Sequence, residues 1–222
     1  MLWLVNMKKI TPEGKYKKMI ESYDLKDHNI WNTTKGDIVE VRKTIREFYL
    51  KEQGYKCAYC RMEKKESHGY TWDIEHVLPK ASYPEYLLEP ENLAIACREC
   101  NNPKDDHEIL SDPKFRTKIY PNDKECFKII HPHFDKYSDN MEVVILNGKR
   151  IYLPLNSGKG KYTLISCDLF RFSYKFAEWE SFDDAAIISF SEFLDNCPAD
   201  ATPDEIKRML GHIKFNLKNL DF

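Results

Sequence analysis

A hydrophobic repeat in the first quarter of the chain predicts an amphipathic helix. Between residues 37 and 55 the apolar positions recur at helical spacing and therefore share one helix face: Ile38, Val41, Ile45, Phe48 and Tyr49. Gly54 comes soon after the last of them, and glycine commonly ends helices because it tolerates left-handed backbone. We expect a helix over 37–55 that leads directly into Cys57.

The next apolar runs are short and alternate with polar loops. Residues 70–76 suit a short strand that Pro79 closes, and residues 92–96 suit a second one. The polar stretch 98–106 then has the character of a helix. This part of the chain therefore has the predicted order β-loop-β-α.

Beyond it, two apolar runs, 141–146 and 150–155, flank Asn147-Gly148. Asparagine and glycine accept the positive φ of a tight hairpin turn, so these runs predict a β-hairpin. Thr202-Pro203-Asp204-Glu205 is a good start for a final helix. The predicted helices after the hairpin are 164–179, 182–196 and 202–217.

These elements give a mixed α+β chain. Its 42% hydrophobic content is enough to bury a core. We divide it into an N-terminal helical segment, 1–55, a central core, 56–110, and a C-terminal extension with the hairpin and mostly helices, 111–222.

The chain contains seven cysteines, and their spacing adds a metal site to the prediction. An odd number, with two C-x-x-C pairs, fits metal ligation better than a disulfide framework. Tetrahedral Zn²⁺ suits the four thiolates of Cys57, Cys60, Cys97 and Cys100, and a closed four-sulfur site is structural. The alternatives are a redox C-x-x-C or unrelated buried thiols. We interpret Cys126, Cys167 and Cys197 as ordinary small apolar residues.

The net charge of −2 gives no global attraction to nucleic acid. Basic residues outnumber acidic ones between Lys114 and Lys175, and the reverse holds after Glu178. Either stretch can be plain solvated surface, or the basic one a local nucleic-acid face. The sequence has neither a long apolar span nor a signal-peptide pattern at Met1 to Ile10, so we expect a cytoplasmic protein without membrane association.

Candidate chemistry lies between the two cysteine pairs, in the run Trp72-Asp73-Ile74-Glu75-His76-Val77-Leu78-Pro79-Lys80. Neighbours on a strand point to opposite faces, so Glu75 and His76 can do different jobs. Hydrolysis of a phosphodiester needs a base for water and a divalent ion for the developing charge. A neutral histidine and a carboxylate supply both needs.

The complete pattern is C-x-x-C, Glu-His-x-x-Pro-Lys, Asn-Leu and C-x-x-C-Asn-x-x-Lys, and it covers about residues 56–105. It resembles the HNH, or His-Me finger, endonuclease family in its zinc-stapled form. The resemblance implies a ββα-metal core whose two ends are joined by structural zinc, and cleavage of DNA with Mg²⁺ or Mn²⁺ as the catalytic ion.

The same resemblance assigns roles to three residues before the second cysteine pair. His76 matches the general base, and Glu75 matches the adjacent acidic metal ligand, where aspartate is commoner. Asn92 matches the central asparagine that fixes the loop between the strands and orients the histidine. Asp73, on the same strand face as Glu75, is an alternative ligand.

Asn101 matches the last motif position, a metal ligand that is histidine in some members. Its alternative role is a helix N-cap. Lys104 and Lys80 match basic positions that can contact phosphate, and the alternative for Lys104 is an ordinary surface residue. His107 lies just beyond the motif.

Two weaker features lie outside the motif. His131, His133 and Asp135 could form a second metal site, but we favour a packed loop that covers the core. Gly158-Lys159-Gly160-Lys161 lacks the spacing of a phosphate-binding loop and is interpreted as a flexible basic turn.

We therefore expect a metal-dependent DNA endonuclease. The alternative is a zinc module that binds nucleic acid without cutting it, because the final motif histidine is missing. By size and layout the chain also resembles the nuclease subunits that accompany an ATPase in bacterial anti-phage systems such as Septu, which implies a protein partner.

Overall fold

A computed structural model describes residues 7–65, 71–146, 149–155 and 158–174. The chain divides into two compact units. The first comprises residues 1–136 with 166–168, and the second comprises 137–165 with 169–222. The predicted α+β class is confirmed by helices combined with two small antiparallel strand pairs. The division into three segments stays a prediction.

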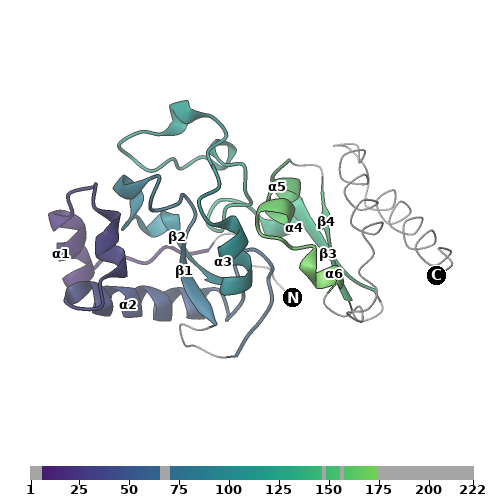
Figure 1. The fold of residues 1–222 in the computed structure, drawn as a ribbon, viewed down its shortest axis with the longest axis horizontal. Helices are drawn as coiled ribbons and strands as arrows, with labels where there is room; N and C mark the ends of the chain where they lie inside the picture. The colour runs from purple at the N-terminus through teal and green to yellow at the C-terminus, as the bar shows by residue number, and fades with distance from the viewer. Residues whose placement is uncertain (1–6, 66–70, 147–148, 156–157, 175–222) are drawn as a thin grey trace. The chain divides into compact units, whose positions relative to one another are not determined.

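The first unit begins with helical segments: α1 (Gly14–Ser22), the 3-10 turn η1 (His28–Asn32) and α2 (Asp37–Glu52). Helix α2 confirms the predicted amphipathic helix, since Ile38, Val41, Ile45 and Tyr49 are buried. It ends at Glu52, earlier than predicted, and Gly54 follows with φ +58°. The apolar spacing thus identified the buried face, and α2 lies alongside the first strand pair (Figure 1).

The predicted β-loop-β-α order is confirmed by β1 (Trp72–His76), β2 (Leu93–Cys97) and α3 (Arg98–Lys104). The strands are antiparallel, with Trp72 opposite Cys97 and His76 opposite Leu93. Strand β2 starts one residue later than predicted because Asn92 belongs to the turn η3 (Pro90–Asn92). Helix α3 stops at Lys104 rather than 106, since Asp105 has a positive φ of 35°.

The outer edge of β2 is closed by the side chain of Gln53, just after α2. Its Oε1 accepts a hydrogen bond from the Ile95 N–H at 2.7 Å, and its Nε2 donates to the Ile95 carbonyl at 2.8 Å. The same Nε2 also donates to the Lys56 carbonyl. An unpaired strand edge is a liability in a buried place, so this amide takes the part of a neighbouring strand.

Several turns fill the rest of the first unit: η2 (Pro84–Tyr86), η4 (Pro113–Phe115) and η5 (Lys124–Cys126). Leu110 pairs with Phe127 in an isolated antiparallel bridge. The segment 107–136 therefore forms an irregular but packed layer, with Ile109, Phe127 and Ile129 buried.

The second unit contains α4 (Tyr137–Asn140), β3 (Met141–Leu146), β4 (Lys149–Pro154), α5 (Gly158–Ser166) and α6 (Arg171–Tyr174). The predicted hairpin is confirmed by the antiparallel pairing of β3 and β4, although β4 is shifted by one residue. The turn residues Asn147 and Gly148 lie outside the described residues. Gly160 meets the Asn140 carbonyl so closely that a Cβ would lie 2.2 Å from its oxygen, which requires glycine here.

The predicted helix 164–179 is wrong in its described part. Helix α5 ends at Ser166, Asp168 has φ +46°, and the Leu169 N–H donates back to the Leu164 carbonyl at 2.9 Å. This is the bond pattern of a helix C-terminus with a left-handed residue. The basic turn expected at Gly158-Lys159-Gly160 is instead the first turn of α5. The predicted helices 182–196 and 202–217 lie outside the described residues.

Candidate active site and zinc centre

The four motif cysteines come together as predicted. Cys57 and Cys60 lie in the turn after α2, Cys97 ends β2, and Cys100 is in α3. All four are buried, and their sulfur atoms lie within 4.8 Å of one another. Hydrogen bonds from the other three thiols, Cys100 first, lower the pKa of Cys97. Four clustered sulfur donors from two tight turns fit one tetrahedral zinc ion.

The cysteines outside the quartet do not join the cluster where they are described. Cys126 and Cys167 are buried apart from the cluster, and Cys197 lies outside the described residues. In the described part of the chain, the cysteine quartet is the one group of three or more His, Cys, Asp or Glu side chains placed to hold a metal. His131, His133 and Asp135 form no such group.

These three residues instead build the packed loop that we favoured. The His131 ring hydrogen-bonds the Tyr120 hydroxyl at 2.9 Å and stacks on Phe134 at 4.2 Å between ring centroids. His133 Nε2 bonds the Leu93 carbonyl at 2.8 Å, and Asp135 accepts from the His131 N–H. The loop therefore covers the start of β2.

His76 ends β1, with its ring enclosed but one nitrogen available. Nε2 lies 3.1 Å from the Leu87 carbonyl, and Trp31 from η1 packs edge-on against the ring at 4.5 Å between centroids. A carbonyl can only accept, so Nε2 carries the proton and Nδ1 holds a lone pair. Within the described structure, Nδ1 makes no hydrogen bond.

Burial also keeps His76 neutral. The residue as a whole is 6% exposed. Burial, followed by the positive charge of Lys80, lowers the pKa of His76 to about 3. At neutral pH the imidazole is therefore an unprotonated base, which is the form that can take a proton from water.

Asn92 fixes the loop between the strands, as the resemblance implied. Its Oδ1 accepts from the Leu78 N–H at 2.7 Å, and its Nδ2 donates to the carbonyls of Leu78 and Tyr86 at 3.2 and 3.0 Å. Its own carbonyl accepts from the Val77 N–H. The residues directly after His76 are thereby tied to the start of β2.

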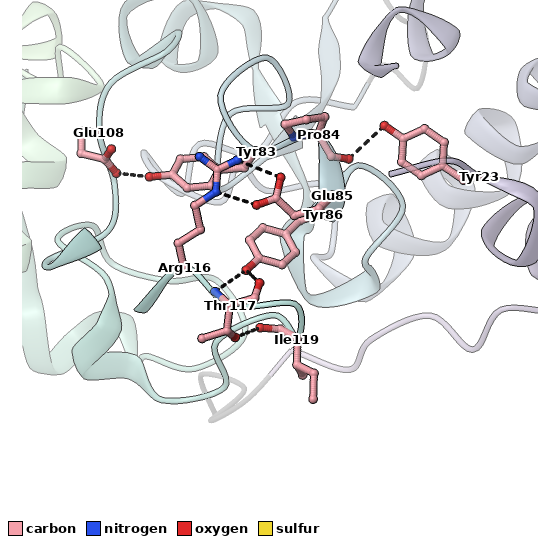
Figure 2. A network of polar contacts seen from close by, with 9 residues as sticks. All are labelled: Tyr23, Tyr83, Pro84, Glu85, Tyr86, Glu108, Arg116, Thr117 and Ile119. Carbon is pink, nitrogen blue, oxygen red and sulfur yellow. Dashed lines mark hydrogen bonds and ion pairs between the residues drawn. The ribbon is translucent and has the colours of Figure 1, made fainter. Parts of the chain in front are cut away.

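A further polar network holds the turn that precedes Leu87 (Figure 2). The Arg116 guanidinium donates to both carboxylate oxygens of Glu85, at 2.7 and 3.0 Å, and lies 4.7 Å from the centre of the Tyr83 ring. The Tyr86 hydroxyl bonds the backbone N–H and carbonyl of Thr117. The other contacts are Tyr83 to Glu108, Tyr23 to the Pro84 carbonyl and Thr117 to the Ile119 carbonyl. This network could not be predicted from the sequence, because Arg116 and Thr117 lie 31 residues from their partners Glu85 and Tyr86.

On the opposite face of β1 from His76, two side-chain contacts join the strand to α3. Asn101 Nδ2 donates to Asp73 Oδ2 at 3.0 Å, and Lys104 Nζ lies 2.6 Å from Glu75 Oε1. Asp73 and Glu75 share a strand face, and Asn101 and Lys104 share a helix face. The two contacts therefore lie side by side in one interface between β1 and α3.

The Glu75–Lys104 pair is enclosed. The side chains are 3% and 1% exposed, and Lys104 also donates to the His76 carbonyl at 3.1 Å. The Tyr59 hydroxyl, from the turn between the first two cysteines, donates to the same Glu75 oxygen at 2.8 Å. Burial raises the pKa of Tyr59 well above its usual value, so it remains a donor. The alternative that Lys104 is a surface residue is wrong.

The predicted catalytic ligands Glu75 and Asn101 thus face the same interface without bonding each other. Glu75 Oε2 and Asn101 Oδ1 make no hydrogen bond within the described structure. Such oxygen donors suit Mg²⁺ or Mn²⁺. Asn101 as an N-cap is wrong, since Cys97 precedes α3 and Asn101 lies inside it.

Lys80 is the remaining predicted phosphate contact. It is half-buried and makes no ion pair among the described residues, and its charge acts on the His76 ring. His107 is exposed beyond α3. Tyr59 and Trp31 were not among the predicted residues, although an aromatic residue between two motif cysteines was a signal for Tyr59.

Comparison with known proteins agrees with this geometry. Residues 57–107 match the family model "HNH endonuclease". The chain is 32% identical over 78 residues to "Septu protein PtuB" of Bacillus thuringiensis, which covers 35% of this chain and 30% of that protein. It is 31% identical over 104 residues to "Protein ea31" of Escherichia phage lambda, covering 46% of this chain and 29% of that protein.

The chain thus spans less than a third of the length of either relative, and no solved structure matches it. No helix in the described ranges is long and apolar enough to cross a membrane. The match covers the cysteine quartet, β1, β2 and α3. This chain therefore contains an HNH endonuclease domain at residues 57–107.

Proposed function

We propose that the protein is a metal-dependent endonuclease that hydrolyses phosphodiester bonds in DNA. The observation that carries the proposal is the neutral, enclosed His76 on one face of β1 with uncommitted oxygen donors on the other. His76 Nδ1 takes a proton from the attacking water while the oxygen of that water forms a bond to phosphorus. The bond from phosphorus to the leaving oxygen breaks in the same displacement.

Glu75 and Asn101 would hold the divalent ion, with Asp73 orienting the Asn101 amide through their 3.0 Å hydrogen bond. The ion would stabilise charge on the phosphate and on the leaving oxygen. Lys80, whose ammonium has no partner among described residues, is the first candidate for a phosphate contact. Lys104 is the second, and it can reach substrate only if its pair with Glu75 opens.

The biological setting that we propose is bacterial anti-phage defence, with a protein partner that includes an ATPase. Similarity to the Septu protein PtuB supports the setting. The net charge of −2 supports a partner, because a free-standing DNA enzyme usually carries a basic surplus. In this arrangement the partner supplies much of the DNA affinity, and the HNH domain supplies the chemistry.

One observation favours a second candidate, a zinc module that binds nucleic acid without cutting. Lys104 already neutralises Glu75 at 2.6 Å, and a lysine at this place competes with a divalent ion. The two candidates differ in whether the zinc-loaded chain binds Mn²⁺, so they are separable by experiment.

The test is cleavage of supercoiled plasmid with Mn²⁺ or Mg²⁺ by zinc-loaded protein. The parent and His107→Ala, an exposed histidine of the same domain, are expected to cut. His76→Ala is expected to lose at least about 100-fold in rate, the lower end of what general-base catalysis contributes. Plasmid binding without cleavage by the parent would favour the zinc module, and equal rates in all three proteins would exclude His76 as the base.

A further inference from the structure

Tyr59 links the zinc centre to the candidate catalytic site. It lies in the turn between Cys57 and Cys60, and its side chain is fully buried. Its hydroxyl reaches out of this turn to Glu75 Oε1 at 2.8 Å. The zinc turn therefore touches the carboxylate that we propose as a catalytic metal ligand.

The two oxygens of Glu75 are used differently. Oε1 receives hydrogen bonds from Tyr59 at 2.8 Å and from the Lys104 ammonium at 2.6 Å, whereas Oε2 receives none within the described structure. Two donors on one oxygen hold a carboxylate in a single rotamer and orientation. The second oxygen is then the one left for a cation.

We propose that Tyr59 is a positioning residue that presents Glu75 Oε2 to the catalytic divalent ion. This inference rests on the proposed function. The turn between Cys57 and Cys60 then has a role beyond holding zinc, because it sets the orientation of a ligand in the neighbouring site. Contacts of this kind commonly change metal affinity by about 10- to 100-fold when they are removed.

The contact could instead serve burial alone. A buried hydroxyl needs a partner, and a phenylalanine would fill the same space with no such need. A role in burial alone predicts that Tyr59→Phe changes stability but leaves divalent-ion binding as it was. Positioning predicts a loss of Mn²⁺ affinity at constant zinc content.

The experiment is Mn²⁺ binding to the zinc-loaded full chain, followed by electron paramagnetic resonance, with plasmid cleavage measured in parallel. We expect Tyr59→Phe to bind Mn²⁺ about 10-fold more weakly than the parent while it retains one zinc. Tyr120→Phe is the matched control, since it removes a buried hydroxyl that bonds His131 instead. Its Mn²⁺ affinity should equal that of the parent.

A second variant keeps the test decisive if Tyr59→Phe loses its zinc. Replacement of Tyr59 by 4-aminophenylalanine keeps the ring and an N–H donor, so it should retain the parental Mn²⁺ affinity. Unchanged or tighter Mn²⁺ binding in Tyr59→Phe, or lost binding in the aminophenylalanine protein with zinc intact, overturns the inference. Failure of the parent itself to bind Mn²⁺ overturns the proposed function instead.

Discussion

The pair formed by Glu75 and Lys104 is closed to solvent at both ends, which makes its two members strongly dependent on each other. Loss of one partner leaves the other as an uncompensated buried charge, which typically costs about 3 to 5 kcal/mol. We therefore expect Lys104→Met to lower the free energy of unfolding by about this amount, as measured by urea denaturation of the zinc-loaded protein.

The control for this prediction is the double variant Lys104→Met with Glu75→Leu, which removes both charges. It should recover most of the lost stability, because an apolar pair can replace a buried ion pair at little cost. Recovery would show that the stability lost in the single variant is due to the unpaired Glu75 carboxylate. A single variant as stable as the parent would contradict the presence of an enclosed ion pair between Glu75 and Lys104.

His76 makes folding stability depend on pH, through a pKa that burial lowers from 6.5 to about 3. Below pH 6.5 the unfolded chain binds a proton here and the folded chain does not, so acid favours unfolding. The contribution of His76 to the free energy of unfolding is fully present above pH 6.5, and it falls by about 1.4 kcal/mol per pH unit as the pH drops towards 3. Unfolding free energies from about pH 7 to 5 should fall more steeply in the parent than in His76→Gln, and equal slopes would contradict this.

At this scale the sequence predicted the clustering of the four cysteines, but not the contacts made by the side chains around them. The cysteine quartet and His76 followed from spacing and motif, and Asn92 makes the loop contacts expected of it. The contacts of Trp31 and Lys104 could not be predicted, since each depends on how distant segments pack, and Tyr59 had only its place between two motif cysteines as a signal. The surface alternative for Lys104 was wrong because a lysine can be buried when it is paired, here with Glu75.

At the scale of elements, the strand pair β1–β2 has only two members and needs its outer edge closed. Gln53 does this with one donor and one acceptor on Ile95. Gln53→Leu keeps the apolar stem but leaves the buried Ile95 N–H without its acceptor, while the Ile95 carbonyl keeps its bond from the Ala58 N–H. We expect a loss of about 1 to 3 kcal/mol in unfolding free energy, whereas exposed Lys51→Ala, two residues away, should change it by less than about 0.5 kcal/mol. Equal effects would mean that the amide does not stabilise the edge.

Periodicity located the long elements better than the short ones. Helix α2 was predicted from its apolar face, and the β3–β4 hairpin from Asn147-Gly148 between two apolar runs. The predicted helix from 164 failed because the chain turns at Asp168, where a non-glycine residue takes positive φ and no local signal marks it. Gly160 was interpreted as flexible, yet it is needed for close packing against the Asn140 carbonyl.

At the scale of the whole molecule, the four clustered cysteines come from the turn after α2, the end of β2 and the body of α3. The sulfurs lie within 4.8 Å of one another, and each ligand pair anchors a different segment of the HNH domain. We therefore predict one zinc ion per chain, and a fall of at least several kcal/mol in unfolding free energy when a chelator removes it, because metal binding to such a site is coupled to folding.

Cys97→Ser should lose the zinc and the same stability, whereas Cys126→Ala, which removes a buried thiol outside the quartet, should keep the zinc. Metal content and thermal unfolding of the three proteins test this together. A parent that holds no zinc, or one whose unfolding is indifferent to the chelator, would mean that the four thiols are only packed side chains and that contacts such as Tyr59 to Glu75 hold the domain without a metal.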